Sequence, residues 1–195
     1  MTVPFPEGKF GAMVADPPWR FIAWADNGNR APDRHYATAT TEDIAALPVA
    51  SIAADDCALF LWATMPLLPE ALQVMAAWGF TYKTIAFTWV KVLANNPRKP
   101  RLGLGYWTRA NAELCLLGTR GSPKRLNRGV SQVIVEPIRE HSRKPDCVHE
   151  RIEALVAGPY IELFARASWP GWTVWGNEAD KFADPQQALS LETPR

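Results

Sequence analysis

Apolar residues in this chain fall into short, nearly continuous runs separated by glycine, proline, asparagine or charged residues. Runs of this kind are typical of strands that are buried on both faces, as in parallel sheets. We therefore predict strands over residues 11–15, 57–63, 81–92, 113–118, 133–135, 160–164 and 171–176.

Helical spacing of apolar residues separates several of these strands. Thr40 is a candidate N-cap for a short helix that ends near Leu47. Two further helices are predicted, one that Gly79 ends and one over residues 145–158. Because strands alternate with helices, the pattern predicts an α/β fold.

Size and composition fit one globular domain. The chain has 195 residues, of which 48% are hydrophobic, enough for a substantial core. We assign the domain to residues 1–183 and predict a flexible tail over 184–195, which is polar and contains proline. A net charge of +1 implies no strong overall attraction to nucleic acid or to a membrane.

Several classes of protein are disfavoured. No run approaches the roughly 20 apolar residues of a membrane helix, and the first residues lack a signal-peptide apolar region, so we expect a cytoplasmic protein. Cys57, Cys115 and Cys147 are isolated from one another, which predicts reduced thiols and no metal site. The absence of a P-loop, of Gly-x-Gly-x-x-Gly after a strand and of a nucleophile elbow disfavours nucleotide kinases and hydrolases.

The first predicted strand ends in the tetrapeptide Asp16-Pro17-Pro18-Trp19. Both prolines fix their own φ angles and lack backbone donors, so we expect a stiff segment that presents a carboxylate, carbonyl oxygens and an indole face. A carboxylate and a carbonyl that accept the N–H bonds of an aryl amine would localise its lone pair and aim it at an electrophile. Trp19 would stack on the ring. A rigid strand exit with a buried tryptophan is an equally acceptable interpretation.

Positive charge is concentrated between residues 91 and 128, where nine basic residues stand against one acid, Glu113. Glycine, asparagine and proline make much of this segment loop, and we predict a basic region that contacts a phosphate backbone. A solvated surface compensated by acids elsewhere is the competing interpretation. The basic residues are Lys91, Arg98, Lys99, Arg101, Arg109, Arg120, Lys124, Arg125 and Arg128.

A loop without periodicity is predicted over residues 20–34, lying over the site. Tyr36 at its end either contacts a substrate phosphate or base, or is an ordinary hydrogen-bonded loop tyrosine.

A series of short motifs, taken in order, resembles the adenine-N6 methyltransferase family typified by the seventy-kilodalton catalytic subunit of the messenger-RNA methyltransferase (the MT-A type). The resemblance runs from about Lys9 to Asp180 and is like that of short bacterial and phage members. Its motifs are Met13-Val14-Ala15-Asp16-Pro17-Pro18-Trp19, His35-Tyr36, Leu59-Phe60-Leu61-Trp62, Trp89-Val90-Lys91, Gly105-Tyr106-Trp107, Glu113-Leu114-Cys115-Leu116-Leu117-Gly118, Ser142-Arg143-Lys144-Pro145-Asp146, Glu162-Leu163-Phe164-Ala165-Arg166 and Trp175-Gly176-Asn177.

This resemblance implies a Rossmann-like methyltransferase fold with a mostly parallel sheet, helices on both faces and a circularly permuted motif order. It implies S-adenosylmethionine as cofactor, with Asp16, Pro17, Pro18 and Trp19 as catalytic residues. The cofactor-binding residues would be Asp16, Lys144, Phe164, Arg166, Asn177 and Glu178. The substrate-binding residues would be Tyr36, Lys91, Arg98, Lys99, Arg101, Trp107 and Glu113.

The chain departs from the family pattern at two places. Ala165 stands where family members often have glycine, and Ser168-Trp169 stand where the eukaryotic enzyme has a His-Asn pair. The eukaryotic enzyme also has an upstream segment that contacts the adenine of the cofactor. We therefore leave the adenine pocket unassigned.

The expected function is methylation of the 6-amino group of adenine in nucleic acid. DNA is favoured over RNA because compact members resemble bacterial and phage modification enzymes. The alternatives are an RNA adenine-N6 methyltransferase and a non-catalytic nucleic-acid-binding subunit, which the intact tetrapeptide and Lys144 disfavour. A homodimer or a complex with a partner subunit is also open.

Overall fold

The computed structural model describes residues 3–20, 38–140, 143–179 and 181. The predicted tail over 184–195, most of the predicted loop over 20–34, and Tyr36 lie outside the described residues. Within the described part of the chain no helix is long and apolar enough to cross a membrane.

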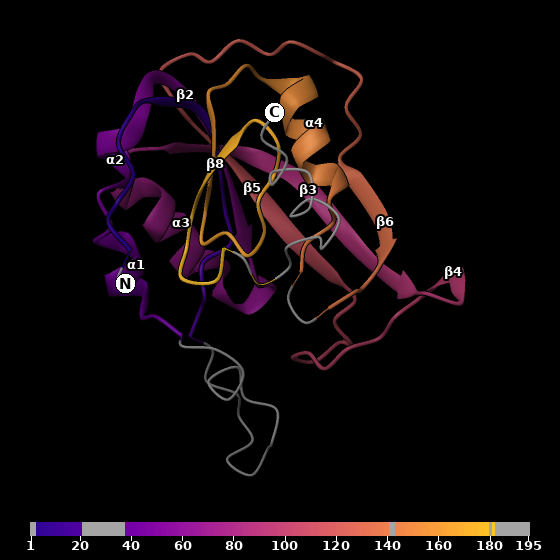
Figure 1. Cartoon of the computed structure of the whole chain (residues 1–195). Helices are drawn as coiled ribbons and strands as arrows, with labels where there is room; N and C mark the ends of the chain where they lie inside the picture. Colours follow the sequence, from indigo (N-terminus) through magenta and orange to yellow (C-terminus); the bar gives the residue numbers. More distant parts are fainter. Residues whose placement is uncertain (1–2, 21–37, 141–142, 180, 182–195) are drawn as a thin grey trace, which may run out of the picture.

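One mixed sheet forms the centre of the molecule (Figure 1). In the described residues it has eight strands in the order β4-β3-β5-β2-β1-β7-β8, with β6 paired to β3. The strands are β1 (Phe10–Ala15), β2 (Ala53–Ala63), β3 (Thr81–Leu93), β4 (Asn96–Pro100), β5 (Ala112–Arg120), β6 (Val133–Pro137), β7 (Tyr160–Leu163) and β8 (Trp172–Trp175).

The expectation of a mostly parallel sheet holds for only part of it. β1 pairs in parallel with β2 and β7, β7 pairs in parallel with β8, and β6 pairs in parallel with β3. β5, however, runs antiparallel to both β2 and β3. The chain passes from β3 to β5 through a hairpin and a loop without a crossover helix, and such a return produces an antiparallel neighbour.

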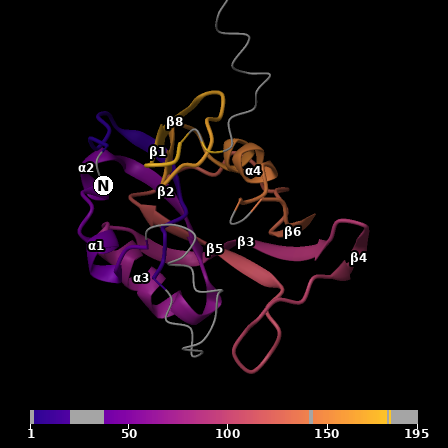
Figure 2. The ribbon, with the colours of Figure 1, turned by 60° about the horizontal axis from the view of Figure 1, so that its bottom comes forward.

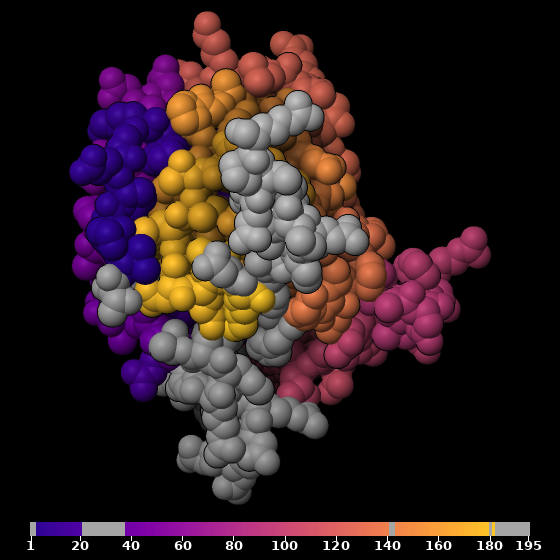
Figure 3. Space-filling model, viewed as in Figure 1, coloured from indigo at the N-terminus to yellow at the C-terminus, as the bar shows by residue number. Residues whose placement is uncertain are grey.

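All the predicted strands are present, with ends that differ by a few residues. β4 was not predicted, because Asn95-Asn96-Pro97 was expected to be loop. In the structure Leu93 pairs with Asn96 and Val92 pairs with Pro100, so Ala94 and Asn95 form the turn of a short hairpin. This hairpin projects from the body of the protein (Figure 3).

The helices are short: α1 (Thr41–Ala45), α2 (Val49–Ile52), α3 (Leu68–Ala77) and α4 (Cys147–Leu155), with a 3₁₀ turn over Met65–Leu67. The predicted N-cap is confirmed, since Thr40 Oγ1 accepts a hydrogen bond from the backbone N–H of Asp43 at 3.1 Å. Gly79 follows α3 at φ +82°, a conformation that ends a helix and suits glycine. The short helix α2 was not predicted.

Helices cover both faces of the sheet (Figure 2). α1 and α3 pack on one face, where the Trp78 Nε1–H donates to the Ile44 carbonyl at 3.0 Å and ties the two helices together. α4 packs on the other face through Val148 and Ile152. The two apolar clusters bury both sides of β1 and β2, which explains why these strands are apolar at nearly every position.

Strand directions bring the predicted site residues to one edge of the sheet. The strands β1, β2, β3, β6, β7 and β8 all end at this edge, which we call the carboxyl edge, and β5 begins there. Open α/β sheets bind ligands at this edge.

The basic segment 91–128 is divided by β5, which crosses the sheet from the carboxyl edge to the opposite one. At the far end the Arg120 Nη1–H donates to the Ala50 carbonyl at 2.9 Å, and the backbone of Arg125 forms an isolated antiparallel β-bridge with Val156. Residues 120–128 therefore lie far from the carboxyl edge, across the top of Figure 1, and are separated from the first part of the basic segment.

Candidate active site

Asp16 follows the last residue of β1, between the ends of β2 and β7. Its Oδ2 accepts a hydrogen bond from Lys144 Nζ at 2.7 Å and lies 3.7 Å from Arg166 Nη2. About one sixth of the side chain is exposed, at 16%. Asp16 is thus a mostly buried carboxylate held between two cations.

The rest of the tetrapeptide is fixed by hydrogen bonds. The Trp19 N–H donates to the Pro17 carbonyl at 2.8 Å, and the Ala39 N–H donates to the Pro18 carbonyl at 3.0 Å. Each carbonyl oxygen has a second lone pair, so both keep acceptor capacity.

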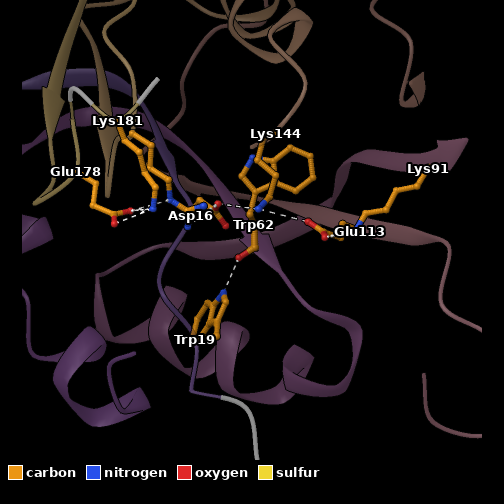
Figure 4. A network of polar contacts seen from close by, with 9 residues as sticks. Asp16, Trp19, Trp62, Lys91, Glu113, Lys144, Glu178 and Lys181 are labelled. Atoms are coloured by element: carbon orange, nitrogen blue, oxygen red, sulfur yellow. Dashed lines mark hydrogen bonds and ion pairs between the residues drawn. The ribbon is translucent and has the colours of Figure 1, made fainter. Parts of the chain in front are cut away.

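Trp19 does not have the role that was expected from the sequence. Its side chain belongs to the apolar core, with 6% of the residue exposed, and its Nε1–H donates to the Trp62 carbonyl at 3.0 Å (Figure 4). An indole in this position offers no free face to a base. For the position of the tryptophan, the structure agrees with the competing interpretation, in which Trp19 is buried.

Lys144 links Asp16 to a second carboxylate. Its Nζ lies 3.4 Å from Glu113 Oε2, and Glu113 in turn pairs with Lys91 (Figure 4). The ammonium also lies over the Trp62 ring, 5.4 Å from its centroid. Lysine and carboxylate thus alternate across the ends of β3, β5 and β1.

The neighbouring charges keep Glu113 and Lys144 ionised. Burial raises the pKa of the Glu113 carboxyl, but the charges of Lys144 and Lys91 outweigh burial and lower this pKa from 4.5 to about 2. Burial likewise lowers the pKa of Lys144, yet the carboxylates of Asp16 and Glu113 dominate and raise it. Lys144 therefore remains an ammonium at neutral pH.

The row continues on the other side of Asp16. Arg166, which follows β7, has its Nε 3.9 Å from Glu178 Oε2, and Lys181 Nζ lies 2.8 Å from Glu178 Oε1. Asn177, beside Glu178, is exposed after β8. The predicted cofactor residues are thereby brought to the same edge as Asp16.

The loops after β7 and β8 approach each other closely. Phe164 has a positive φ of 62° and packs edge-on against Trp175 at 5.7 Å. A Cβ at Gly176 would lie 2.6 Å from the Ala165 carbonyl oxygen and 2.7 Å from its nitrogen. The close approach therefore depends on Gly176, and Ala165, where the family often has glycine, is accommodated with 1% exposed.

Arg139 is a site residue that the sequence reasoning missed. It binds both carboxylate oxygens of Asp146, at 2.6 and 2.7 Å, and its Nη2–H donates to the Lys144 carbonyl at 3.0 Å. It therefore fixes the backbone that carries Lys144. The alternation of charge in Arg139-Glu140 and Arg143 to Asp146 was the available signal. Trp62, whose carbonyl and ring contact Trp19 and Lys144, was also missed.

The remaining predicted substrate residues are spread over the hairpin and the loop that follows it. Arg98 and Lys99 on β4, and Arg101 and Trp107 beyond it, are exposed. Lys91, at the base of the hairpin, forms an ion pair with Glu113 and so belongs to the row of charges.

The chemistry of the site is that of binding and orientation. Burial raises the pKa of Cys57 to about 12 and that of Cys115 well above its usual value, so neither thiol is an activated nucleophile. In the described residues no three His, Cys, Asp or Glu side chains cluster as metal ligands do. A carboxylate between fixed cations, beside carbonyl oxygens, suits an amine and a zwitterion.

Comparison with known proteins identifies relatives over almost the whole chain. The MT-A70 family model matches residues 10–178. A type II methyltransferase, M.MunI, from a Mycoplasma species is 33% identical, over 89% of this chain and 79% of the relative.

Longer eukaryotic proteins match equally well over a smaller share of their own length. The N(6)-adenosine-methyltransferase MT-A70-like protein of Drosophila melanogaster is 35% identical over 92% of this chain and 29% of its own length. The human N(6)-adenosine-methyltransferase catalytic subunit METTL3 is 34% identical over 89% of this chain and 29% of its own length. The chain thus spans less than a third of these two relatives.

Proposed function

The chain belongs to the MT-A70 family, as the motif resemblance indicated, and from this premise and its site we propose that it is an S-adenosylmethionine-dependent adenine-N6 methyltransferase that acts on DNA. The observation that carries this proposal is the Asp16–Lys144 contact of 2.7 Å, which holds a carboxylate at the end of β1 beside Arg166.

The residues at the carboxyl edge fit the proposed cofactor. S-adenosylmethionine combines a carboxylate, an ammonium and a sulfonium, and it would supply an electrophilic methyl group. Lys144 and Arg166 are matched to the carboxylate, and Asp16 and Glu178 are matched to the positive groups. We propose that these four residues hold it together with Phe164 and Asn177 at the closely packed ends of β7 and β8.

Asp16 has the central role in this proposal. A carboxylate offers about four acceptor sites, and Lys144 occupies one, so Asp16 can still accept an N–H of the adenine 6-amino group. The Pro17 carbonyl, which has one lone pair beyond its bond from Trp19, would accept the other. Two such acceptors localise the amine lone pair and fix its direction, which is catalysis by orientation and electrostatics. Trp19 and Pro18 then act as supports, because they hold Pro17 in place.

Contacts to the target nucleotide are assigned to the opposite side of Asp16. Glu113 and Lys91 form the end of the row of charges beyond Lys144, and from there they would bind a base edge or sugar. Arg98, Lys99 and Arg101 would contact phosphates, which requires only exposed cations. Trp107 is assigned to the same side, and Tyr36 keeps its proposed role without structural support, because it lies outside the described residues.

DNA is favoured over RNA by the similarity to the type II methyltransferase M.MunI, of which the chain covers 79%. If the substrate is a duplex, the target adenine must rotate out of the stack to reach a mostly buried carboxylate.

We also propose that residues 1–183 form one Rossmann-like domain with permuted motif order, because Asp16 after β1 precedes Arg166 after β7 in the chain, and that it acts in the cytoplasm. A homodimer or a partner subunit is compatible with this domain.

Methyl transfer from radiolabelled S-adenosylmethionine to adenine-containing DNA and RNA tests the proposal. We expect label in DNA as N6-methyladenine, less label in RNA, and none with Asp16→Ala. Asp55→Ala removes an exposed carboxylate at the opposite edge and is the matched control that should retain activity. Activity that survives Asp16→Ala would sink the mechanism. A calorimetric titration that shows no affinity for S-adenosylmethionine would instead identify a non-catalytic, nucleic-acid-binding subunit.

A further inference from the structure

A rigid hairpin-like loop, residues 101–111, joins β4 to β5 and is here called the tip loop. The Gly103 N–H donates to the Ala110 carbonyl at 2.6 Å, and a Cβ at Gly103 would lie 2.9 Å from that oxygen. A Cβ at Gly105 would meet the Thr108 carbonyl oxygen at 2.5 Å. The two sides of the loop thus touch along their backbones, and the loop projects from the body of the protein (Figure 2).

Trp107 at the end of this loop combines two features that no other large apolar side chain among the described residues combines. It has a positive φ of 59° and a relative exposure of 106%. Among the described non-glycine residues only Phe164 shares a positive φ, and Phe164 is 8% exposed in the core. A non-glycine residue with a positive φ costs backbone strain, and such outliers gather at sites that bind ligands, so a strained and fully exposed indole marks Trp107 as a candidate contact residue.

Both faces of the Trp107 ring are therefore open to solvent. An aromatic platform for single-stranded nucleic acid lies against the protein surface and offers one face to a base. An indole that stands away from the surface has two faces to cover, and a stack of bases covers both. Side chains that insert between base pairs are apolar and project in this way.

The charges around the tip loop favour a polyanion. Arg98 and Lys99 precede it on β4, and Arg101 and Arg109 lie on its two sides; all four are exposed. No acidic residue occurs between Lys91 and Glu113. Cations that flank an apolar tip match phosphates on either side of a base stack.

The base of the tip loop is attached to the candidate active site. The Arg101 N–H donates to the Lys91 carbonyl at 2.8 Å, and the Lys91 N–H donates to the Asn111 carbonyl at 2.8 Å. Lys91 and Glu113, directly beyond these bonds, belong to the row of charges that reaches Asp16 through Lys144. Both sides of the base of the tip loop are thus hydrogen-bonded to Lys91, a residue of the candidate site.

We propose that Trp107 inserts into the base stack of duplex DNA and occupies the space that the target adenine leaves when it rotates toward Asp16. This inference rests on the proposed methylation of adenine. It names the substrate as a duplex, and it assigns to Trp107 the replacement of lost base stacking rather than contact with the flipped base.

Methylation of a mixed-sequence adenine-containing duplex and of its isolated strands tests this inference. Stacking is worth about 1–3 kcal/mol per base in alanine substitutions, so Trp107→Ala should lower kcat/KM on the duplex about 5- to 150-fold and leave the single strand within about 3-fold. Trp107→Phe should retain most duplex activity. A mismatch opposite the adenine should restore part of the loss, because the base is already less stacked. Leu126→Ala, which removes an exposed apolar side chain (61%) at the opposite edge, is the matched control.

Fluorescence of 2-aminopurine in place of the target adenine provides a readout without turnover. Wild type should raise the fluorescence by unstacking the base, and Trp107→Ala should raise it less. Equal effects of Trp107→Ala on duplex and single strand, or no effect on either, would overturn the inference while methylation by wild type leaves the proposed function standing. A change of oligomeric state in light scattering without a change in duplex preference would make the tip loop a protein interface and would also overturn it. If wild type methylates no adenine, the proposed function fails, and the fluorescence assay still decides insertion.

Discussion

Lys144 Nζ lies 2.7 Å from Asp16 Oδ2 although the two residues are 128 positions apart in the chain. Both side chains are mostly buried, at 17% and 16% exposed. An ion pair in this setting holds each partner in one geometry, and removal of either leaves the other charge poorly compensated. The contact therefore fixes the direction of the Asp16 carboxylate, and Lys144 is the residue that positions Asp16 in the proposed reaction.

Lys144→Met should nearly abolish methyl transfer. Loss of one preorganised group of this kind typically lowers kcat about 100- to 1,000-fold, and here the Asp16 carboxylate would keep only Arg166, at 3.7 Å. Steady-state methylation kinetics measure the effect. Lys124→Met, which removes an exposed lysine beyond the far end of β5, should leave kcat unchanged. A kcat close to wild type for Lys144→Met would contradict the assigned role.

Glu113→Gln should destabilise the protein in a pH-dependent way. The pKa of Glu113 is depressed in the folded state from 4.5 to about 2, so its ionised form stabilises the fold above pH 4.5. This contribution is lost as the pH falls toward 2. We expect wild type to be more stable than the variant by about 1.5–3 kcal/mol at neutral pH, with a difference that shrinks in acid. Urea unfolding across this range measures it, and a constant difference would exclude the linkage.

Trp19→Phe should lower stability and kcat but not affinity for DNA. Phenylalanine keeps most of the buried ring but leaves the Trp62 carbonyl without its donor, at a cost of about 1–3 kcal/mol. Trp78→Phe breaks a similar buried bond, to the Ile44 carbonyl, and should cost the same stability without loss of kcat. Chemical unfolding measures the stability of both variants, methylation kinetics measure their kcat, and DNA-binding assays measure their affinity for DNA. A stable Trp19→Phe variant with weakened DNA binding would restore the stacking role.

Gly176→Ala should weaken binding of S-adenosylmethionine. The new Cβ would meet backbone atoms of Ala165 at 2.6 and 2.7 Å, and because backbone cannot rotate away, the ends of β7 and β8 must separate. Overpacking of this kind costs about 1–3 kcal/mol, and part of it should be seen as a higher Kd in calorimetry. Gly129→Ala, whose Cβ would only approach Asn127 Oδ1 at 3.4 Å, is the control. Equal Kd values for both variants would separate Gly176 from the cofactor site.

Local sequence was sufficient for most of the elements. The apolar runs predicted the strands, and Thr40 and Gly79 marked helix ends, because capping and turn geometry depend on a few neighbouring residues. The β4 hairpin was missed, since Asn96-Pro97 lacks the apolar pattern of a strand and forms one through its pairing with β3. Arg139 was missed because its partners, the Asp146 carboxylate and the Lys144 carbonyl, become significant only when the loop is folded.

By itself, the sequence determined that a rigid Asp-Pro-Pro-Trp segment ends a buried strand and that charged residues follow several other strands. These are properties of short segments, set by proline geometry and by apolar periodicity. Tertiary structure decided which strand ends meet: β1 lies between β2 and β7, so Asp16 is brought to Arg166, and Lys144 is brought to both carboxylates. It also decided that Trp19 is buried while Trp107 is exposed, and that β5 separates the two halves of the basic segment. These outcomes depend on long-range pairing and on which surface remains uncovered, and neither is encoded in any single stretch of the chain.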